Sequence, residues 1–191
     1  MATATTAGQL YARAMAATQR IVDGVPQDRW HASTPCTEWD ASQVANHIIG
    51  ENLWAGELFQ GKTIEQVGST LDGDLTGDDP AAAYRRSVEI ARKAVEAPGA
   101  MEATCHLSFG DHSGADYASQ LFMDTLIHGW DIAKGTGQDT RLDLELVAAC
   151  LPIAEDLTRQ FRSAGVFGED LPVSADADPE TKLLALVGRT P

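Results

Sequence analysis

One segment of the chain combines two carboxylates and an imidazole at spacings that bring them together on a helix. Asp124, His128 and Asp131 are separated by four and three residues, so on an α-helix their side chains lie on one face. The apolar pattern, with Leu121 and Tyr117 one and two turns earlier, places this face toward the core. Burying such groups costs free energy unless they are paired, hydrogen-bonded or bound to a cation. The segment therefore indicates half of a metal site or a buried polar network.

A second helical stripe, earlier in the chain, carries polar groups in the same unusual way. It is formed by Val44, His47, Ile48, Glu51, Ala55 and Leu58. Two histidines and one carboxylate make up a known catalytic ligand set for zinc, which leaves a position for water or substrate. Nickel, iron and manganese also accept mixed nitrogen and oxygen ligands. We therefore predict that His47, Asp124 and His128 bind a divalent metal, with zinc as the first choice and nickel or another transition metal as alternatives.

Each of these polar side chains also has a simpler interpretation. A histidine on an apolar helix face can be a hydrogen-bonded core residue, and Asp124 or Asp131 can accept from an Arg or a backbone amide. Glu51 is a candidate general base, or a carboxylate that reaches the rim of the bundle. Asp131 is a candidate for supporting a ring nitrogen of a ligand or for proton transfer. Trp54 and Trp130 could form a pocket wall, but core packing is the better expectation for both.

The elements that must position these residues are nearly all helical. Helices are expected over about residues 6–23, 40–59, 80–96, 115–134 and 143–164, with a closing helix within 178–188. The second helix has the clearest start: Asp40 and Gln43 have capping-box spacing, and Trp39 with Val44 has hydrophobic-staple spacing. Gly61 and Gly135 are the expected stops after the second and fourth helices. Residues 62–79 should form a loop that can contain one short turn, and a short extended segment is expected near 103–109. The fold class is therefore all-α: a four-helix bundle with extra short helices, in a single domain over residues 1–191.

Composition excludes several classes of function. The net charge of −14 argues against a nucleic-acid partner, which requires a basic surface. We find no apolar run long enough to span a membrane and no signal peptide, so we expect a cytoplasmic protein. The three cysteines form no pair with metal-binding or redox spacing, which favours free thiols at Cys36, Cys105 and Cys150. An exposed bundle face could support a homodimer.

Three motifs resemble one known family. They are Thr34-Pro-Cys-Thr-Glu-Trp-Asp40 with Val44-Ala-Asn-His47-Ile-Ile-Gly-Glu51, then Met123-Asp-Thr-Leu-Ile-His-Gly-Trp-Asp-Ile-Ala133, and finally Asp178-Pro-Glu-Thr-Lys-Leu-Leu-Ala-Leu-Val-Gly-Arg189. They resemble the DinB-like superfamily and, within it, the mycothiol-dependent maleylpyruvate isomerase-like metal-binding proteins. The resemblance implies a DinB-like four-helix bundle whose divalent metal is held by His47, Asp124 and His128. The maleylpyruvate isomerase branch has Glu, and other branches have His, where this chain has Asp124, so metal preference and substrate do not transfer.

Two functions follow as hypotheses. The first is an enzyme that uses the metal to activate a low-molecular-weight thiol, mycothiol by the resemblance, for S-transfer to a small electrophile or for its isomerisation. Glu51 or Asp131 would carry the proton in that reaction. The alternative is a non-catalytic metal-binding or small-ligand-binding protein of the same fold. An accessible site with an open metal position would favour the enzyme, and a closed site would favour a structural metal.

Overall fold

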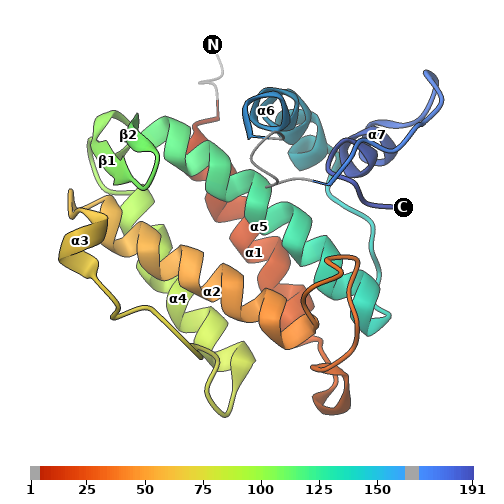
Figure 1. The fold of residues 1–191 in the computed structure, drawn as a ribbon, viewed down its shortest axis with the longest axis horizontal. Coiled ribbons are helices and arrows are strands. Elements are labelled where there is room, and N and C mark those ends of the chain that lie inside the picture. The colour runs from red at the N-terminus through yellow and green to blue at the C-terminus, as the bar shows by residue number, and fades with distance from the viewer. Residues whose placement is uncertain (1–4, 162–167) are drawn as a thin grey trace. The chain divides into compact units, whose positions relative to one another are not determined.

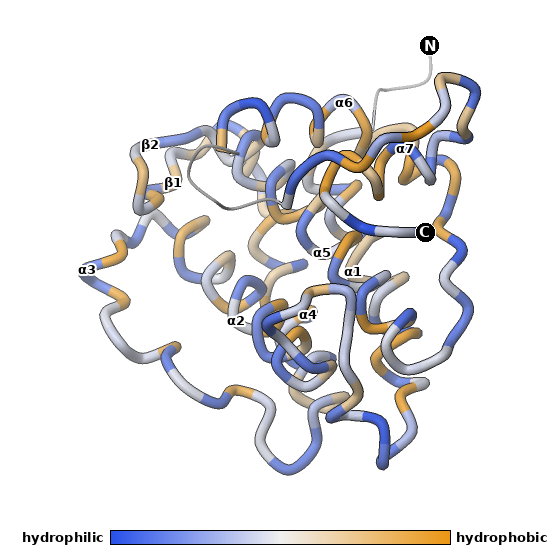
Figure 2. Tube along the Cα trace, turned by 45° about the vertical axis from the view of Figure 1, so that its right-hand side comes forward, coloured by the Kyte–Doolittle hydropathy of each residue, from blue (hydrophilic) through white to orange (hydrophobic). Residues whose placement is uncertain are grey.

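Four long helices pack side by side in the part of the chain that ends at Asp139 (Figure 1). They are α1 (Ala7–Asp23), α2 (Ala41–Leu58), α4 (Pro80–Val95) and α5 (Gly114–Thr136). Helix α1 packs against α5 and α4, and α2 packs against α4 and α5. Each of these helices contains both hydrophobic and hydrophilic stretches (Figure 2), as amphipathic bundle helices require. The computed structural model, which describes residues 5–161 and 168–191, therefore confirms the all-α, four-helix prediction.

The start of α2 follows the local sequence signals. The Asp40 carboxylate accepts from the backbone N–H of Gln43, and the Gln43 side-chain oxygen accepts from the backbone N–H of Asp40, both at 2.9 Å. This reciprocal pair satisfies two of the free N–H groups at the helix start. In α4, Asp79 caps the helix and Pro80 takes its first position, where a missing N–H costs nothing. The predicted starts of both helices are confirmed.

The end of α5 differs from the prediction. The helix continues through Gly135 to Thr136, and Gly137, with φ of +77°, is the residue that ends it. Gly135 serves a different purpose, because a Cβ atom there would lie 2.7 Å from the carbonyl oxygen of Ser33. Its own carbonyl also accepts a hydrogen bond from Arg29. The glycine therefore lets the segment that precedes α2 lie directly against α5.

Short elements connect the four long helices. The short helix α3 (Ile64–Val67) interrupts the predicted loop, and 3₁₀ turns occupy Gln27–Arg29 and Ala100–Glu102. The predicted extended segment is an antiparallel hairpin formed by β1 (Thr104–Leu107) and β2 (Gly110–Ser113). Only β1 falls within the expected range, and β2 lies wholly beyond it, because the pairing partner of a strand cannot be read from one short alternating pattern.

A second compact unit begins at Thr140. It contains α6 (Leu144–Phe161) and α7 (Pro179–Leu186), which pack against each other. Asp178 caps α7, and the Glu180 carboxylate accepts from the backbone N–H of Leu142. Residues 162–164, the expected end of the fifth helix, lie outside the described residues. The assignment of residues 1–191 to a single domain stays a prediction. Within residues 5–161 and 168–191, no helix combines the length and apolar character that crossing a bilayer requires.

Candidate metal centre

The packing of α2 against α5 brings three predicted ligands together. Asp124 and His128 lie one turn apart on α5, and His47 reaches them from α2. The two carboxylate oxygens of Asp124 lie 3.2 and 3.1 Å from Nε2 of His47, and one of them lies 3.4 Å from Nε2 of His128. One ligand atom from each residue lies within 4.8 Å of the other two. Two nitrogens and one oxygen therefore converge at one point, in the donor combination that a divalent transition metal accepts.

The three side chains lie at the edge of the bundle core. The exposed fractions are 25% for His47, 30% for Asp124 and 12% for His128. The sequence pattern placed these three side chains and Asp131 on stripes facing the core, but of the four only Asp131, at 0% exposed, is fully buried. Partial exposure leaves room for water or a ligand beside the three donors. This geometry is that of an accessible site.

Charge holds His47 and Asp124 together. Burial alone would lower the pKa of His47, but the charge and hydrogen bond of Asp124, assisted by the charge of Glu51, outweigh it and raise the pKa from 6.5 to about 9. The pair is therefore an ion pair at neutral pH in the metal-free protein. A metal binds neutral imidazole, so a cation at this point must displace the proton from His47.

Asp131 fixes the orientation of the His128 ring. Its Oδ2 lies 3.0 Å from Nδ1 of His128, one turn away on the same helix. With the proton assigned to Nδ1 by this hydrogen bond, Nε2 keeps its lone pair and points toward Asp124. A carboxylate behind a histidine ligand is the usual arrangement in metal sites. Asp131 thus contacts the far side of a candidate ligand and does not join His47 and Asp124.

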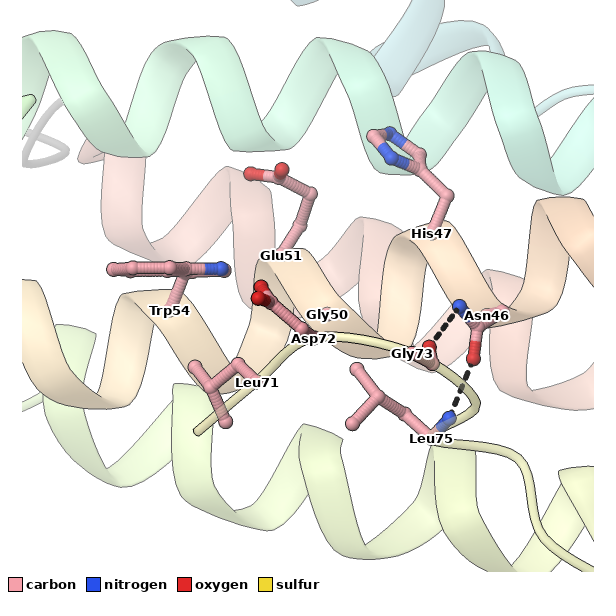
Figure 3. Close-up of a pocket in the computed structure, with 9 residues that line it drawn as sticks. All are labelled: Asn46, His47, Gly50, Glu51, Trp54, Leu71, Asp72, Gly73 and Leu75. Carbon is pink, nitrogen blue, oxygen red and sulfur yellow. Dashed lines mark hydrogen bonds between the residues drawn. The ribbon is translucent and has the colours of Figure 1, made fainter. Parts of the chain in front are cut away.

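Glu51 lies one turn after His47 and has no hydrogen bond or ion pair to any described residue. Figure 3 shows its carboxyl group and the His47 ring extending from α2 to the same side, toward α5. Burial, assisted by the charge of Asp124 and opposed by the charges of His47 and His128, raises the pKa of Glu51 from 4.5 to about 7. Glu51 can therefore take up and release a proton near neutral pH.

Two residues beside the centre were not assigned to it from the sequence. The ring of Trp39 lies 4.9 Å from that of His47 and 5.8 Å from that of His128. The thiol of Cys36, from the same loop, lies within 4.8 Å of ligand atoms of His128 and Asp131. The only sequence signals were the staple spacing of Trp39 and the closeness of the Cys36 loop to α2. Neither signal could reveal that this loop lies against α5.

The remaining aromatic and histidine candidates fall in other places. Trp130 is a core residue with 1% exposed, as predicted, whereas Trp54 lines an open groove of about 360 Å³ beside His47 and Glu51. His31 pairs with Asp40, and His106 pairs with Asp111 in the hairpin. His112 lies against the ring of Phe109. These three histidines take no part in the convergent group.

Comparison with known proteins places the chain in a family. The family described as "Mycothiol maleylpyruvate isomerase N-terminal domain" matches residues 11–133, which include α2, most of α5 and all three convergent side chains. Two uncharacterized proteins of Mycobacterium tuberculosis, from strains CDC 1551 / Oshkosh and ATCC 25618 / H37Rv, are each 33% identical over 184 residues, covering 93% of this chain and 94% of their own length. No solved structure matches the chain significantly. The chain belongs to the mycothiol maleylpyruvate isomerase N-terminal domain family, a DinB-like family.

Proposed function

We propose that the protein is a divalent-metal-dependent enzyme that activates a low-molecular-weight thiol, mycothiol or a similar compound. It transfers the sulfur to a small electrophilic substrate, or isomerises that substrate by adding and later expelling the thiol. The observation that carries this proposal is the convergence of His47, Asp124 and His128 within 4.8 Å. Family membership supports the proposal, because the description of the family names a mycothiol maleylpyruvate isomerase.

His47, Asp124 and His128 would hold the cation through two nitrogens and one oxygen. Zinc suits this set best, and nickel or another transition metal is the alternative. A bound divalent cation lowers the pKa of a coordinated thiol, so that a thiolate is available at neutral pH. Asp131, 3.0 Å from Nδ1 of His128, would keep that ring in the orientation that offers Nε2.

Glu51 would accept the proton of the thiol and return it to the product. Its carboxyl group faces the same side as His47, and its pKa of about 7 suits a group that both accepts and donates near neutral pH. The thiol S–H bond loses its proton to Glu51, the sulfur forms a bond to the electrophilic carbon, and Glu51 returns the proton to the adduct. In an isomerisation the carbon–sulfur bond then breaks and the thiol is regenerated.

The accessibility of the centre favours this enzyme over a non-catalytic metal-binding or small-ligand-binding protein. A structural metal is enclosed by four protein ligands, whereas His47 and Asp124 are 25% and 30% exposed and one groove opens beside them. Such a site keeps positions for a thiol or water.

The first experiment measures the metal content of protein purified without added metal. We expect the wild type to carry about one divalent ion per chain and His128→Ala to lose it. His106→Ala is the matched control, because His106 also pairs with an aspartate but lies in the hairpin. Equal metal content in the wild type and His128→Ala would overturn the site.

The second experiment measures thiol consumption with a panel of small electrophiles. We expect the wild type to accelerate the loss of free thiol and Glu51→Gln to slow it while binding the same amount of metal. Activity that survives complete removal of the metal by a chelator would refute the mechanism, even with the metal site confirmed.

A further inference from the structure

The two ring nitrogens of His128 face two different sets of donor atoms. Nε2 lies 3.4 Å from a carboxylate oxygen of Asp124 and, with His47, belongs to the candidate centre, which we call the outer set. Nδ1, across the ring, lies 3.0 Å from Oδ2 of Asp131. One ligand atom each of Cys36, His128 and Asp131 lies within 4.8 Å of the other two. Since Nε2 is directed away from Asp131, Nδ1 is the nitrogen that can complete this second group, which we call the inner set.

The loop before α2 holds Cys36 in a fixed position. The backbone N–H of Cys36 donates to Oγ1 of Thr34 at 3.2 Å, and its carbonyl accepts from the backbone N–H of Trp39 at 2.8 Å. Oγ1 of Thr34 in turn donates to the carbonyl of Trp39 at 2.7 Å. The close approach that Gly135 allows keeps the same loop against α5. The sulfur is therefore placed before a ligand arrives, and binding requires little further ordering of the loop.

The inner set has the donors and the charge that a thiophilic divalent cation requires. It combines a sulfur, an imidazole nitrogen and a carboxylate oxygen, and thiolate is a soft ligand that selects such cations. The side chain of Asp131 is 0% exposed and that of His128 is 12% exposed, so a neutral assembly is favoured there. A divalent cation with one carboxylate and one thiolate carries no net charge. Cys36 is partly exposed, which gives the cation a path of entry.

We propose that Cys36, Asp131 and Nδ1 of His128 form a second metal site, which binds a thiophilic divalent cation such as cadmium and excludes a metal from the outer set. On binding, the S–H bond of Cys36 gives its proton to solvent and the sulfur bonds to the cation. A neutral imidazole has one lone pair, on the nitrogen that lacks the proton. A cation on Nδ1 therefore leaves the proton on Nε2, facing Asp124, and the outer set loses one of its three ligands.

The two parts of this inference have separate foundations. Binding by the inner set rests on the convergence of Cys36, His128 and Asp131 alone. The exclusion of a second metal rests in addition on the proposed function, because it requires that the outer set binds a cation. Each part is therefore tested with its own probe.

The first experiment titrates the metal-free full chain with cadmium and records the ultraviolet charge-transfer absorption of a cadmium–thiolate bond. We expect the wild type to bind one equivalent with this absorption. Cys36→Ala should lose the absorption and bind cadmium about tenfold more weakly or worse, since loss of even a supporting group has that effect. Cys105→Ala is the matched control, because this thiol lies in the hairpin, and it should match the wild type. No absorption in the wild type, or the same absorption in Cys36→Ala, would overturn the inner site.

Two substitutions in the outer set separate it from the inner set. His47→Gln and Asp124→Asn each remove an outer ligand and leave Cys36, Asp131 and Nδ1 of His128 in place. Both should keep the cadmium–thiolate absorption at one equivalent, with urea unfolding used to confirm that each variant is folded. Loss of the absorption in a folded variant would assign Cys36 to the outer set and overturn a separate inner site.

The second experiment tests the exclusion with manganese, which prefers oxygen and nitrogen ligands to thiolate and so reports on the outer set. Free manganese is followed by electron paramagnetic resonance. One equivalent of cadmium should release manganese from the wild type, and Cys36→Ala should require about tenfold more cadmium. Full binding of both ions to the wild type would overturn the exclusion. Absent manganese binding with an intact, Cys36-dependent cadmium absorption would count against the outer set and leave the inner site standing.

Discussion

Replacing Asp131 by Asn tests whether a buried carboxylate supports the metal site through His128. Asp131 is fully buried, and its Oδ2 lies 3.0 Å from Nδ1 of His128. Asn has nearly the same volume and can still accept the hydrogen bond from Nδ1. It carries no negative charge, however, and so does not increase the basicity of Nε2, the atom that would bind the metal. Removing such a partner of a metal-ligating histidine typically lowers metal affinity tenfold to a hundredfold, about 1.4–2.7 kcal/mol. We expect Asp131→Asn to bind zinc more weakly by that factor.

The assay is competition for zinc against a chromophoric chelator, with urea unfolding of the metal-free proteins measured in parallel. The unfolding data show whether a loss of affinity comes from the site or from a damaged fold. Asp111→Asn is the matched control, because Asp111 also accepts from a histidine Nδ1, at 2.7 Å, in the exposed hairpin. Zinc affinity equal to that of the wild type in a fully folded Asp131→Asn protein would refute the role of Asp131 in supporting His128 as a ligand.

Three further predictions concern the bundle around the site. In Gly129→Ala, the new Cβ would lie 2.3 Å from Oγ1 of Thr18, so the free energy of unfolding in urea should fall by about 1–3 kcal/mol; unchanged stability would contradict this packing. In the metal-free protein, the raised pKa of His47 stabilises the fold fully below pH 6.5, and this contribution is lost as the pH rises through about 9. Urea unfolding should show that decline, at most about 3 kcal/mol, and His47→Gln should lack it; equal pH profiles would contradict the His47 ion pair with Asp124. With a thiol reagent, Cys36 should react in the native protein, whereas the other two cysteines, both 0% exposed, should react only after unfolding; a second fast thiol would contradict that burial.

Local sequence determined the helices and half of the candidate centre. Capping by Asp40 and Asp79 depends on groups three residues away, so the starts of α2 and α4 were predictable. The four-residue spacing of Asp124 and His128 places them on one helix face in any fold that keeps this helix. The second polar stripe added the expectation that His47 completes the set, and the resemblance to the DinB-like family implied the same three ligands; this ligand set remains a prediction.

Tertiary packing decided what no local signal contains. His47 and Asp124 are 77 residues apart in sequence, and their contact exists only because α2 packs against α5. Gly135 was mistaken for a helix stop, since its real constraint is the approach of Ser33, a residue distant in sequence.

The surroundings of the centre were also decided by packing. The position of Trp39 over both histidines and the groove wall held by Asn46 depend on how loops fold back onto helices. Helix caps and helical spacing involve residues within one or two turns of each other, so they can be predicted from the local sequence. Contacts between elements depend on which apolar faces meet, and only the folded chain settles that.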